Sequence, residues 1–187
     1  MKLRDPRILV RGTLKGRGIE ILETAGCDVD HQPEHKPGSL ADVIEPFAGV
    51  IVHSHHFVDA ATINAGSALR VVGRAGAGVD NIDVQAATEA GVLVMNLPWG
   101  NTITAAEHTV ALMLALARNI PQASAALRAG TWDRKPYLGV ELSGKILGVI
   151  GFGRIGREVA RRAHGFEMKV IASDPYVSER VAADVGI

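Results

Sequence analysis

Several residue types are scarce in this chain of 187 residues, and each scarcity excludes a class of protein. A single cysteine, Cys27, permits neither an internal disulfide nor a cage of thiolate ligands around a metal. Lysine plus arginine and aspartate plus glutamate number 20 each, so the basic excess of a dedicated nucleic-acid binder is missing. Aromatic residues make up 4% of the chain, but hydrophobic residues make up 47%, which excludes global disorder.

Long hydrophobic runs are also missing. The longest strongly apolar stretch covers residues 110–117, whereas a helix that spans a bilayer needs about 20 residues. The first residues carry charges but no apolar core of a signal peptide. We therefore expect a cytoplasmic protein without a membrane partner or a nucleic-acid partner.

Short apolar runs recur through the first half of the chain. Strands of about four residues that alternate with helical stretches indicate βαβ units and a parallel sheet. Between two of these runs, Ser39 is expected to cap a helix that continues through Glu45. The predicted strands cover residues 7–10, 27–30, 49–52, 70–73 and 92–95.

The pattern changes after residue 100. Apolar residues at helical spacing predict a long helix over residues 102–118, which Pro121 should end. A second helix is expected up to Gly130, followed by a polar loop in which Trp132 and Tyr137 are expected to be packing anchors. We place the domain boundary where the pattern changes, with one domain over residues 1–99 and another over residues 100–187.

A glycine motif of the form GxGxxG follows an apolar strand over residues 145–150. It consists of Gly151, Gly153 and Gly156, and a helix is expected over residues 157–164. A further strand over residues 169–172 leads to Asp174, 18 residues after Gly156. The order of strand, glycines, helix, strand and acid is the context that predicts a dinucleotide-binding site.

Each part of this motif has a physical role in binding a dinucleotide. Gly151 permits a tight turn, Gly153 lets a pyrophosphate approach the backbone, and Gly156 lets the helix pack against the strand. The helix N-terminus then faces the diphosphate. Asp174 would accept hydrogen bonds from ribose hydroxyls and repel a 2′-phosphate, which favours NAD over NADP. The alternative is a glycine-rich turn with an aspartate that caps a loop.

Four stretches of this sequence carry a resemblance to a known family. The chain resembles the D-isomer-specific 2-hydroxyacid dehydrogenases over nearly its whole length, most strongly over residues 71–175. The matching stretches are VVGRAGAGVDNIDV (71–84), NLPWGNTITAAEHTVALMLALAR (96–118), IPQASAALRAGTWDR (120–134) and ELSGKILGVIGFGRIGREVA (141–160).

The resemblance implies an α/β fold with a flavodoxin-like parallel-sheet substrate domain, followed by an incomplete Rossmann NAD-binding domain. It implies NAD as cofactor, a small 2-hydroxy or 2-oxo acid as substrate, and a homo-oligomer, typically a dimer formed through the NAD domains. It also implies which residues bind each molecule. The expected cofactor-binding residues are Ala77, Gly151, Gly153, Arg154, Ile155, Gly156 and Asp174. The expected substrate-binding residues are His53, Ser54, Arg74, Gly76 and Asn101, with the amides of Gly76 holding the substrate carboxylate.

Two departures from the family pattern qualify these expectations. Relatives that act on phosphorylated acids commonly carry Arg-Ser where this chain has His53-Ser54, so the identity of the acid is open. The family's catalytic Arg, Glu and His would lie beyond Ile187, so we expect no catalytic residue within the chain. A non-catalytic regulatory or corepressor-like NAD-binding module and an inactive fragment are the alternatives to an NAD-dependent oxidoreductase.

A metal site is the remaining possibility considered. His53, His55 and His56 lie close together, but no carboxylate or cysteine stands at ligand spacing from them. We therefore expect no metal, and we expect the three histidines to lie in a loop at the edge of the site.

Overall fold

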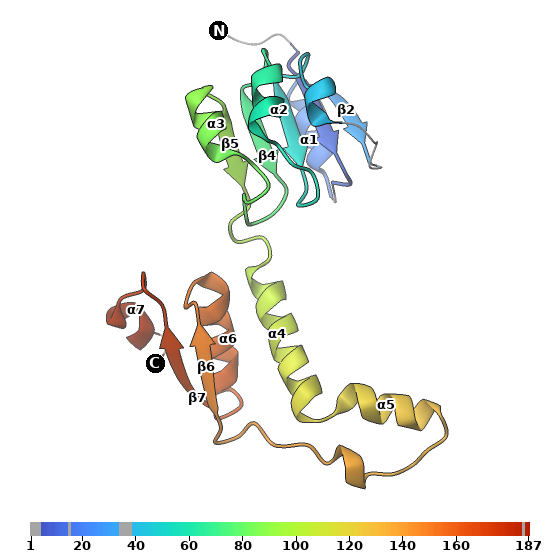
Figure 1. Ribbon diagram of the computed structural model, residues 1–187, viewed down its shortest axis with the longest axis vertical. Helices are drawn as coiled ribbons and strands as arrows, with labels where there is room; N and C mark the ends of the chain where they lie inside the picture. The colour runs from blue at the N-terminus through green and yellow to red at the C-terminus, as the bar shows by residue number, and fades with distance from the viewer. Residues whose placement is uncertain (1–4, 15, 34–38, 185) are drawn as a thin grey trace. The chain divides into compact units, whose positions relative to one another are not determined.

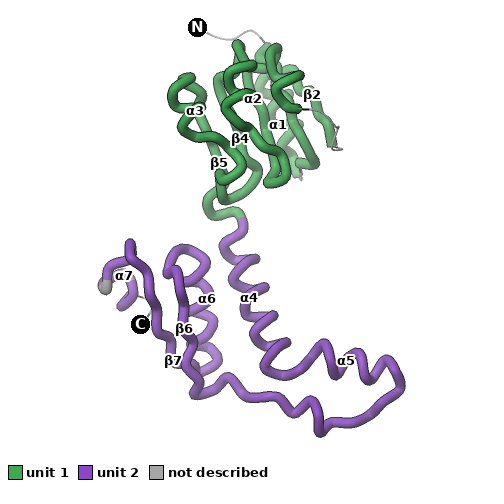
Figure 2. Tube along the Cα trace, viewed as in Figure 1, with its two compact units in different colours: residues 1–100 green, residues 101–187 purple. Residues whose placement is uncertain are grey.

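A computed structural model of the chain describes residues 5–14, 16–33, 39–184, 186 and 187. It divides into two compact units, Met1–Gly100 and Asn101–Ile187 (Figure 2). Each unit has its own buried core.

Unit 1 is built on a five-stranded parallel sheet (Figure 1). The strands are β1 (Arg7–Arg11), β2 (Asp28–Gln32), β3 (Gly49–Val52), β4 (Val71–Arg74) and β5 (Leu93–Asn96). Their spatial order is β2-β1-β3-β4-β5, and every neighbouring pair is parallel. This is the flavodoxin-like order, so the expected fold class is confirmed for this unit.

Alternation along the strands separates the two faces of this sheet. Leu9, Val52 and Val72 belong to a buried cluster that also contains residues of α2 (Ala60–Ala65) and α3 (Val84–Glu89). The opposite face carries Ile8 and Val71, with α1 (Gly18–Thr24) nearby.

The segment after Ser39 differs from its prediction. Ser39 does cap a helical segment, and Asp42 completes a capping box, but the segment is a single 3₁₀ turn over Leu40–Asp42. The prediction of a helix that continues through Glu45 was therefore wrong. Glu45 precedes Pro46, and the proline ring disfavours helical backbone at the residue before it.

Unit 2 contains two packed layers around one βαβ motif. Strands β6 (Ile146–Ile150) and β7 (Lys169–Ser173) pair in parallel, and α6 (Arg154–His164) connects them (Figure 1). The long helix α4 (Thr102–Ala117) packs against α6, where Arg162 and Glu107 form an ion pair at 3.4 Å. The remaining elements are α5 (Ile120–Arg128), η2 (Lys135–Tyr137) and α7 (Glu179–Ala183).

The break between α4 and α5 lies earlier than predicted. Asn119 adopts the left-handed conformation with φ 52°, and Pro121 stands in the first turn of α5 rather than at the end of α4. Proline fits the first turn because the N–H it lacks would have no helical partner there. Trp132 is 77% exposed, so its predicted role as a packing anchor was wrong.

None of the described helices is by itself both long enough and apolar enough to cross a membrane. The pair α4 and α5 passes the length and composition test together, with a bend of 64° between the two helices.

Candidate cofactor and substrate sites

The glycine motif forms a tight turn between β6 and α6. Gly151 has φ +86°, which favours glycine, and its N–H donates to the carbonyl oxygen of Ser173 at 2.9 Å. At Gly156 an added Cβ would clash with the carbonyl oxygen of Gly151. The turn and the start of α6 therefore have room for no side chain at position 156.

The surroundings of Gly153 are different. A Cβ added there would have no heavy atom within 4 Å, among the residues that the structure describes. Gly153 is the N-cap of α6, and no described side chain caps this helix end. The start of α6 thus combines open space at Gly153 with a helix end that no described side chain caps, which suits the binding of an anionic group at a helix N-terminus.

Asp174 fixes the same turn from the end of β7. Its Oδ2 accepts a hydrogen bond from the N–H of Phe152 at 2.7 Å, and its Oδ1 accepts one from the N–H of Tyr176 at 2.8 Å. The aspartate therefore does cap a loop, as in the alternative interpretation of the motif. A carboxylate has about four acceptor positions, so these two bonds leave capacity for ribose hydroxyls.

Polar side chains of unit 1 gather at one end of its sheet. Arg11, Arg74 and Asn96 are the last residues of β1, β4 and β5, and His53 directly follows β3. The strand register pairs Val52 with Arg74 and Arg74 with Asn96. The carboxyl ends of parallel strands are the edge where open α/β sheets bind ligands, so this edge is the candidate substrate site.

The loop after β4 is held by β5 and covered by Arg74. The N–H of Leu97 donates to the Gly76 carbonyl oxygen at 2.9 Å, and Asn96 Nδ2 donates to the Ala77 carbonyl oxygen at 2.6 Å. The Arg74 guanidinium lies where a Cβ on Gly76 would be. Its Nε is buried without a hydrogen-bond partner in the described part of the chain.

Gly76 itself does not present a free amide. Its N–H donates to the Arg74 carbonyl oxygen at 2.8 Å in a three-residue turn. The amide expected to hold a carboxylate is thus engaged within the loop. The guanidinium of Arg74 is the charged donor group at this position.

The histidine cluster, which consists of His53, His55 and His56, lies beside the loop after β4. The rings of His53 and His55 are 6.1 Å apart and nearly parallel, and those of His55 and His56 are 4.1 Å apart. Ser54 is exposed. Within the described ranges, no group of three or more histidine, cysteine or acidic side chains could hold a metal ion.

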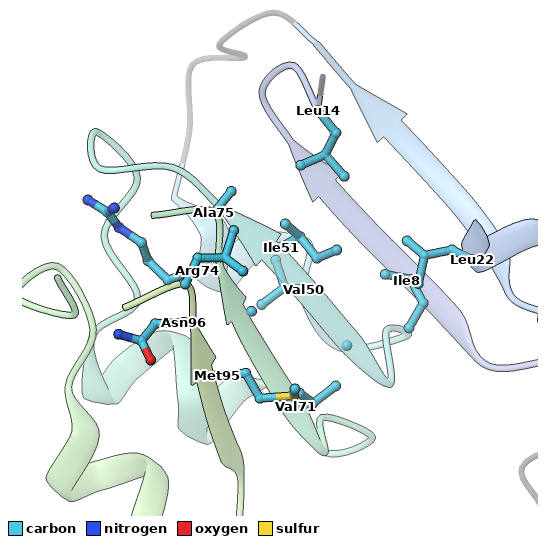
Figure 3. A pocket seen from close by; sticks show the side chains of 13 residues that line it. Ile8, Leu14, Leu22, Val50, Ile51, Val71, Arg74, Ala75, Met95 and Asn96 are labelled. Carbon is cyan, nitrogen blue, oxygen red and sulfur yellow. The ribbon is translucent and has the colours of Figure 1, made fainter. Parts of the chain in front are cut away.

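Figure 3 shows an apolar pocket on the face of the sheet that carries α1. Its volume is about 410 Å³, and aliphatic side chains such as Ile8, Ile51 and Met95 line most of it. Arg74 and Asn96 contribute polar groups only at the carboxyl ends of β4 and β5. The pocket therefore offers few groups that could orient a small polar acid.

The other predicted residues are divided between the units. Asn101 is exposed and stands directly before α4, in unit 2 rather than in the unit with the other predicted substrate residues. Arg154 and Ile155 open α6, which begins three residues before the predicted helix start at residue 157. Asn81 and Asn96 were not predicted as site residues, although each asparagine follows an apolar run or a glycine-rich turn in the sequence.

Comparisons with known proteins identify the family. The family model described as "D-isomer specific 2-hydroxyacid dehydrogenase, catalytic domain" matches residues 8–183. A D-3-phosphoglycerate dehydrogenase from Rattus norvegicus is 47% identical over 181 residues, which is 97% of this chain and 34% of the relative. The chain therefore spans about a third of the length of the curated relatives it matches.

Solved structures show the same likeness. An NAD⁺-bound 3-phosphoglycerate dehydrogenase from Entamoeba histolytica matches with a TM-score of 0.74 and 30% identity, covering 93% of this chain and 55% of that one. An acyclic imino acid reductase in complex with NADPH and D-Arg matches with a TM-score of 0.83 and 27% identity, covering 92% and 57%. This chain belongs to the D-isomer-specific 2-hydroxyacid dehydrogenase family.

Proposed function

We propose that this chain is the part of an NAD-dependent oxidoreductase of D-2-hydroxy acids that binds the cofactor and the acid. The observation that carries the proposal is the hydrogen bond between Asp174 and Phe152. It places the Asp174 carboxylate, at the end of β7, directly beside the proposed phosphate-binding turn. A pyrophosphate over Gly153 and a ribose at Asp174 would then be neighbours, as a dinucleotide requires.

Residues of this chain would hold NAD in defined places. The open space at Gly153 and the first amides of α6 fit a pyrophosphate, and Arg154 and Ile155 would contact it from the first turn. The resemblance also assigns a cofactor contact to Ala77, in the loop after β4. When bound, the nicotinamide exchanges a hydride with the carbon that carries the hydroxyl or oxo group.

The acid would bind at the carboxyl edge of the sheet in unit 1. Arg74 would hold the carboxylate, since a guanidinium offers paired donors in the geometry of a carboxylate. His53 and Ser54, which directly follow β3 at the same edge, would contact the other end of the acid. Relatives named D-3-phosphoglycerate dehydrogenase support a phosphoglycerate-like acid, and by resemblance a place in serine biosynthesis.

We further propose that residues 1–187 by themselves bind but do not turn over. Oxidation requires that a base removes the hydroxyl proton, and a positioned base contributes roughly 10²–10⁴-fold to the rate. The resemblance provides no residue of this chain for that role. The alternative function is a regulatory or corepressor-like module that binds NAD without catalysis.

The experiment follows NADH absorbance with 3-phospho-D-glycerate, D-lactate and D-glycerate in turn. We expect negligible turnover by residues 1–187, and turnover by a longer protein that contains them. Robust turnover by residues 1–187 would contradict the proposal that these residues bind the cofactor and the acid without catalysing the reaction. A longer protein that binds NAD but oxidises no 2-hydroxy acid would favour the regulatory alternative.

A further inference from the structure

Asn81 connects two loops of the candidate substrate site from inside the protein. It is 4% exposed, and its Nδ2 donates to the carbonyl oxygens of His53 at 3.0 Å and His56 at 2.6 Å. A primary amide carries two protons, so one side chain of the loop after β4 fixes both ends of the turn after β3.

The two carbonyls also determine which way the amide points. A flipped amide would place its oxygen against two carbonyl oxygens, so the donor assignment is fixed by the network. The cost is that Asn81 Oδ1 is buried without a hydrogen-bond partner among the described residues. A buried polar atom without a partner is rare and needs an explanation other than stability.

The backbone of Asn81 fastens the same turn a second time. The N–H of Val58 donates to the Asn81 carbonyl oxygen at 2.9 Å, and the N–H of Asp83 donates to the Val58 carbonyl oxygen at 2.8 Å. Residues 53–58 and 81–83 are thus joined by hydrogen bonds from both the backbone and the side chain of Asn81. Loss of the side-chain amide would leave the backbone link in place and release only the carbonyls of His53 and His56.

The position of the turn after β3 determines where the His53 ring lies. The N–H of His56 donates to the His53 carbonyl oxygen at 3.1 Å, and the N–H of His53 donates to His56 Nδ1 at 3.4 Å. The His53 ring packs on Gly12, where a Cβ would be 2.6 Å from His53 Cδ2. Rotation of this turn would therefore move the His53 ring away from Gly12 and change the position of Ser54.

We propose that Asn81 is a positioning residue of the substrate site, which orients His53 and Ser54 for the acid by holding the carbonyls of residues 53 and 56. The proposal rests on the proposed function, because it assigns the acid to this edge of the sheet. Asn81 is buried and does not itself touch the acid.

The experiment titrates the isotope-labelled chain with 3-phospho-D-glycerate and follows the backbone amide of Ser54 and the ring signals of His53 by NMR. Asn81→Asp keeps the shape of the side chain but has no N–H to donate, and Asn81→Ala removes the whole amide. Ile63→Val, a change in the buried core of unit 1, is the control for a small loss of stability. Arg74→Ala tests whether the acid binds at this edge at all.

We expect the wild-type chain to bind and Arg74→Ala to abolish binding. Both Asn81 variants should weaken binding about tenfold or more, because a displaced His53 or Ser54 would lose its hydrogen bond to the anionic acid. The control should stay within about twofold of wild type. Asn81 variants that fold and bind like wild type would overturn the proposal, as would an equal loss in Ile63→Val. Wild-type chain without any shift at Ser54 or His53 would overturn the proposed function and the positioning role with it.

Should Asn81→Asp and Asn81→Ala both fail to fold, Asn81→Ser provides the decisive variant, because its hydroxyl can still donate one hydrogen bond. Partial retention of acid binding in Asn81→Ser would support the positioning role. Full wild-type affinity in that variant would contradict it, because a single shorter donor cannot span both carbonyls.

Discussion

The carboxylate of Asp174 accepts a hydrogen bond from the N–H of Phe152 at 2.7 Å, across the turn between β6 and α6. The same side chain accepts from Tyr176 at 2.8 Å. Asp174 therefore has a structural role that exists before any ribose is bound.

Replacement of Asp174 should destabilise unit 2 as well as weaken cofactor binding. Asp174→Ala leaves the part-buried N–H of Phe152 without an acceptor, at a cost of about 1–3 kcal/mol, whereas the exposed N–H of Tyr176 can bond to water instead. Asp174→Asn keeps one acceptor oxygen and should lose less. Denaturant unfolding of both variants measures the difference, and an Asp174→Ala chain as stable as wild type would show that the loop does not depend on this carboxylate.

Two glycines of the same motif should respond in opposite ways to an added methyl group. Gly156→Ala would clash with the Gly151 carbonyl oxygen, so we expect a loss of about 1–3 kcal/mol in unfolding free energy. Gly153→Ala meets open space at φ −74°, so its stability should stay close to that of wild type. Its affinity for NADH should nevertheless fall, because the methyl group stands between the backbone and the pyrophosphate.

Thermal unfolding and calorimetric titration of the two variants make this comparison. Equal loss of stability in both would contradict the geometry of the turn. Unchanged NADH affinity in Gly153→Ala would remove the pyrophosphate from this position.

Asp59 should make the stability of unit 1 depend on acid pH. Asp59 is the N-cap of α2, and the hydrogen bonds from the N–H and hydroxyl of Thr62, at 2.8 and 2.7 Å, lower the pKa of its carboxyl group. A pKa that is lower in the folded state stabilises the protein above the unfolded-state pKa of about 3.9, and this contribution is lost as the pH falls through the folded-state pKa.

Asp59→Asn separates the cap from the charge. It keeps an acceptor for the N–H of Thr62, so stability at neutral pH should change little, while the acid-dependent part disappears. Asp59→Ala should cost about 0.5–2 kcal/mol at neutral pH. Unfolding curves of the three proteins between neutral and acid pH are the measurement, and identical acid dependence in Asp59→Asn would show that another group is responsible.

Exposed apolar side chains of unit 2 predict self-association. Leu116, Trp132 and Leu138 are 79%, 77% and 72% exposed, and apolar surface of this kind marks interaction sites. Because the resemblance implies a dimer formed through the NAD domains, Leu116→Glu should weaken association, whereas Phe57→Ser in unit 1, at a side chain that is 71% exposed, should not. Sedimentation at tens of micromolar provides the measurement, and a clean wild-type monomer would contradict the prediction.

Periodicity and the spacing of glycines predict much of this fold, for a physical reason. Buried strands such as β3 and β4 are continuous apolar runs, and the glycine motif with Asp174 needs one backbone geometry to function. Two segments differ from their predictions because of a proline. Pro46 disfavours helical backbone at the residue before it, so the helix predicted after Ser39 is only a 3₁₀ turn. Pro121 fits the first turn of a helix, so it lies at the start of α5 instead of ending α4. These are local effects, which a hydrophobic pattern does not contain.

The substrate edge is less accessible to prediction from the sequence. Arg74 and His53 are assigned by the resemblance of their motifs to the family, but the role of Asn81 depends on contacts with residues 25 and 28 positions away. The engagement of the Gly76 amide with the Arg74 carbonyl oxygen depends on the exact backbone of one loop. Neither feature leaves a signal in the composition or the periodicity.

The most direct test of the cofactor site is a calorimetric titration of the chain with NADH and with NADPH, repeated for Asp174→Asn. A charged hydrogen bond contributes about 1.5–3 kcal/mol, so wild type should prefer NADH by about 10- to 100-fold, and the preference should shrink in Asp174→Asn. Equal wild-type affinities for the two nucleotides, or an Asp174→Asn chain with an unchanged preference, would contradict the assignment of the ribose to Asp174.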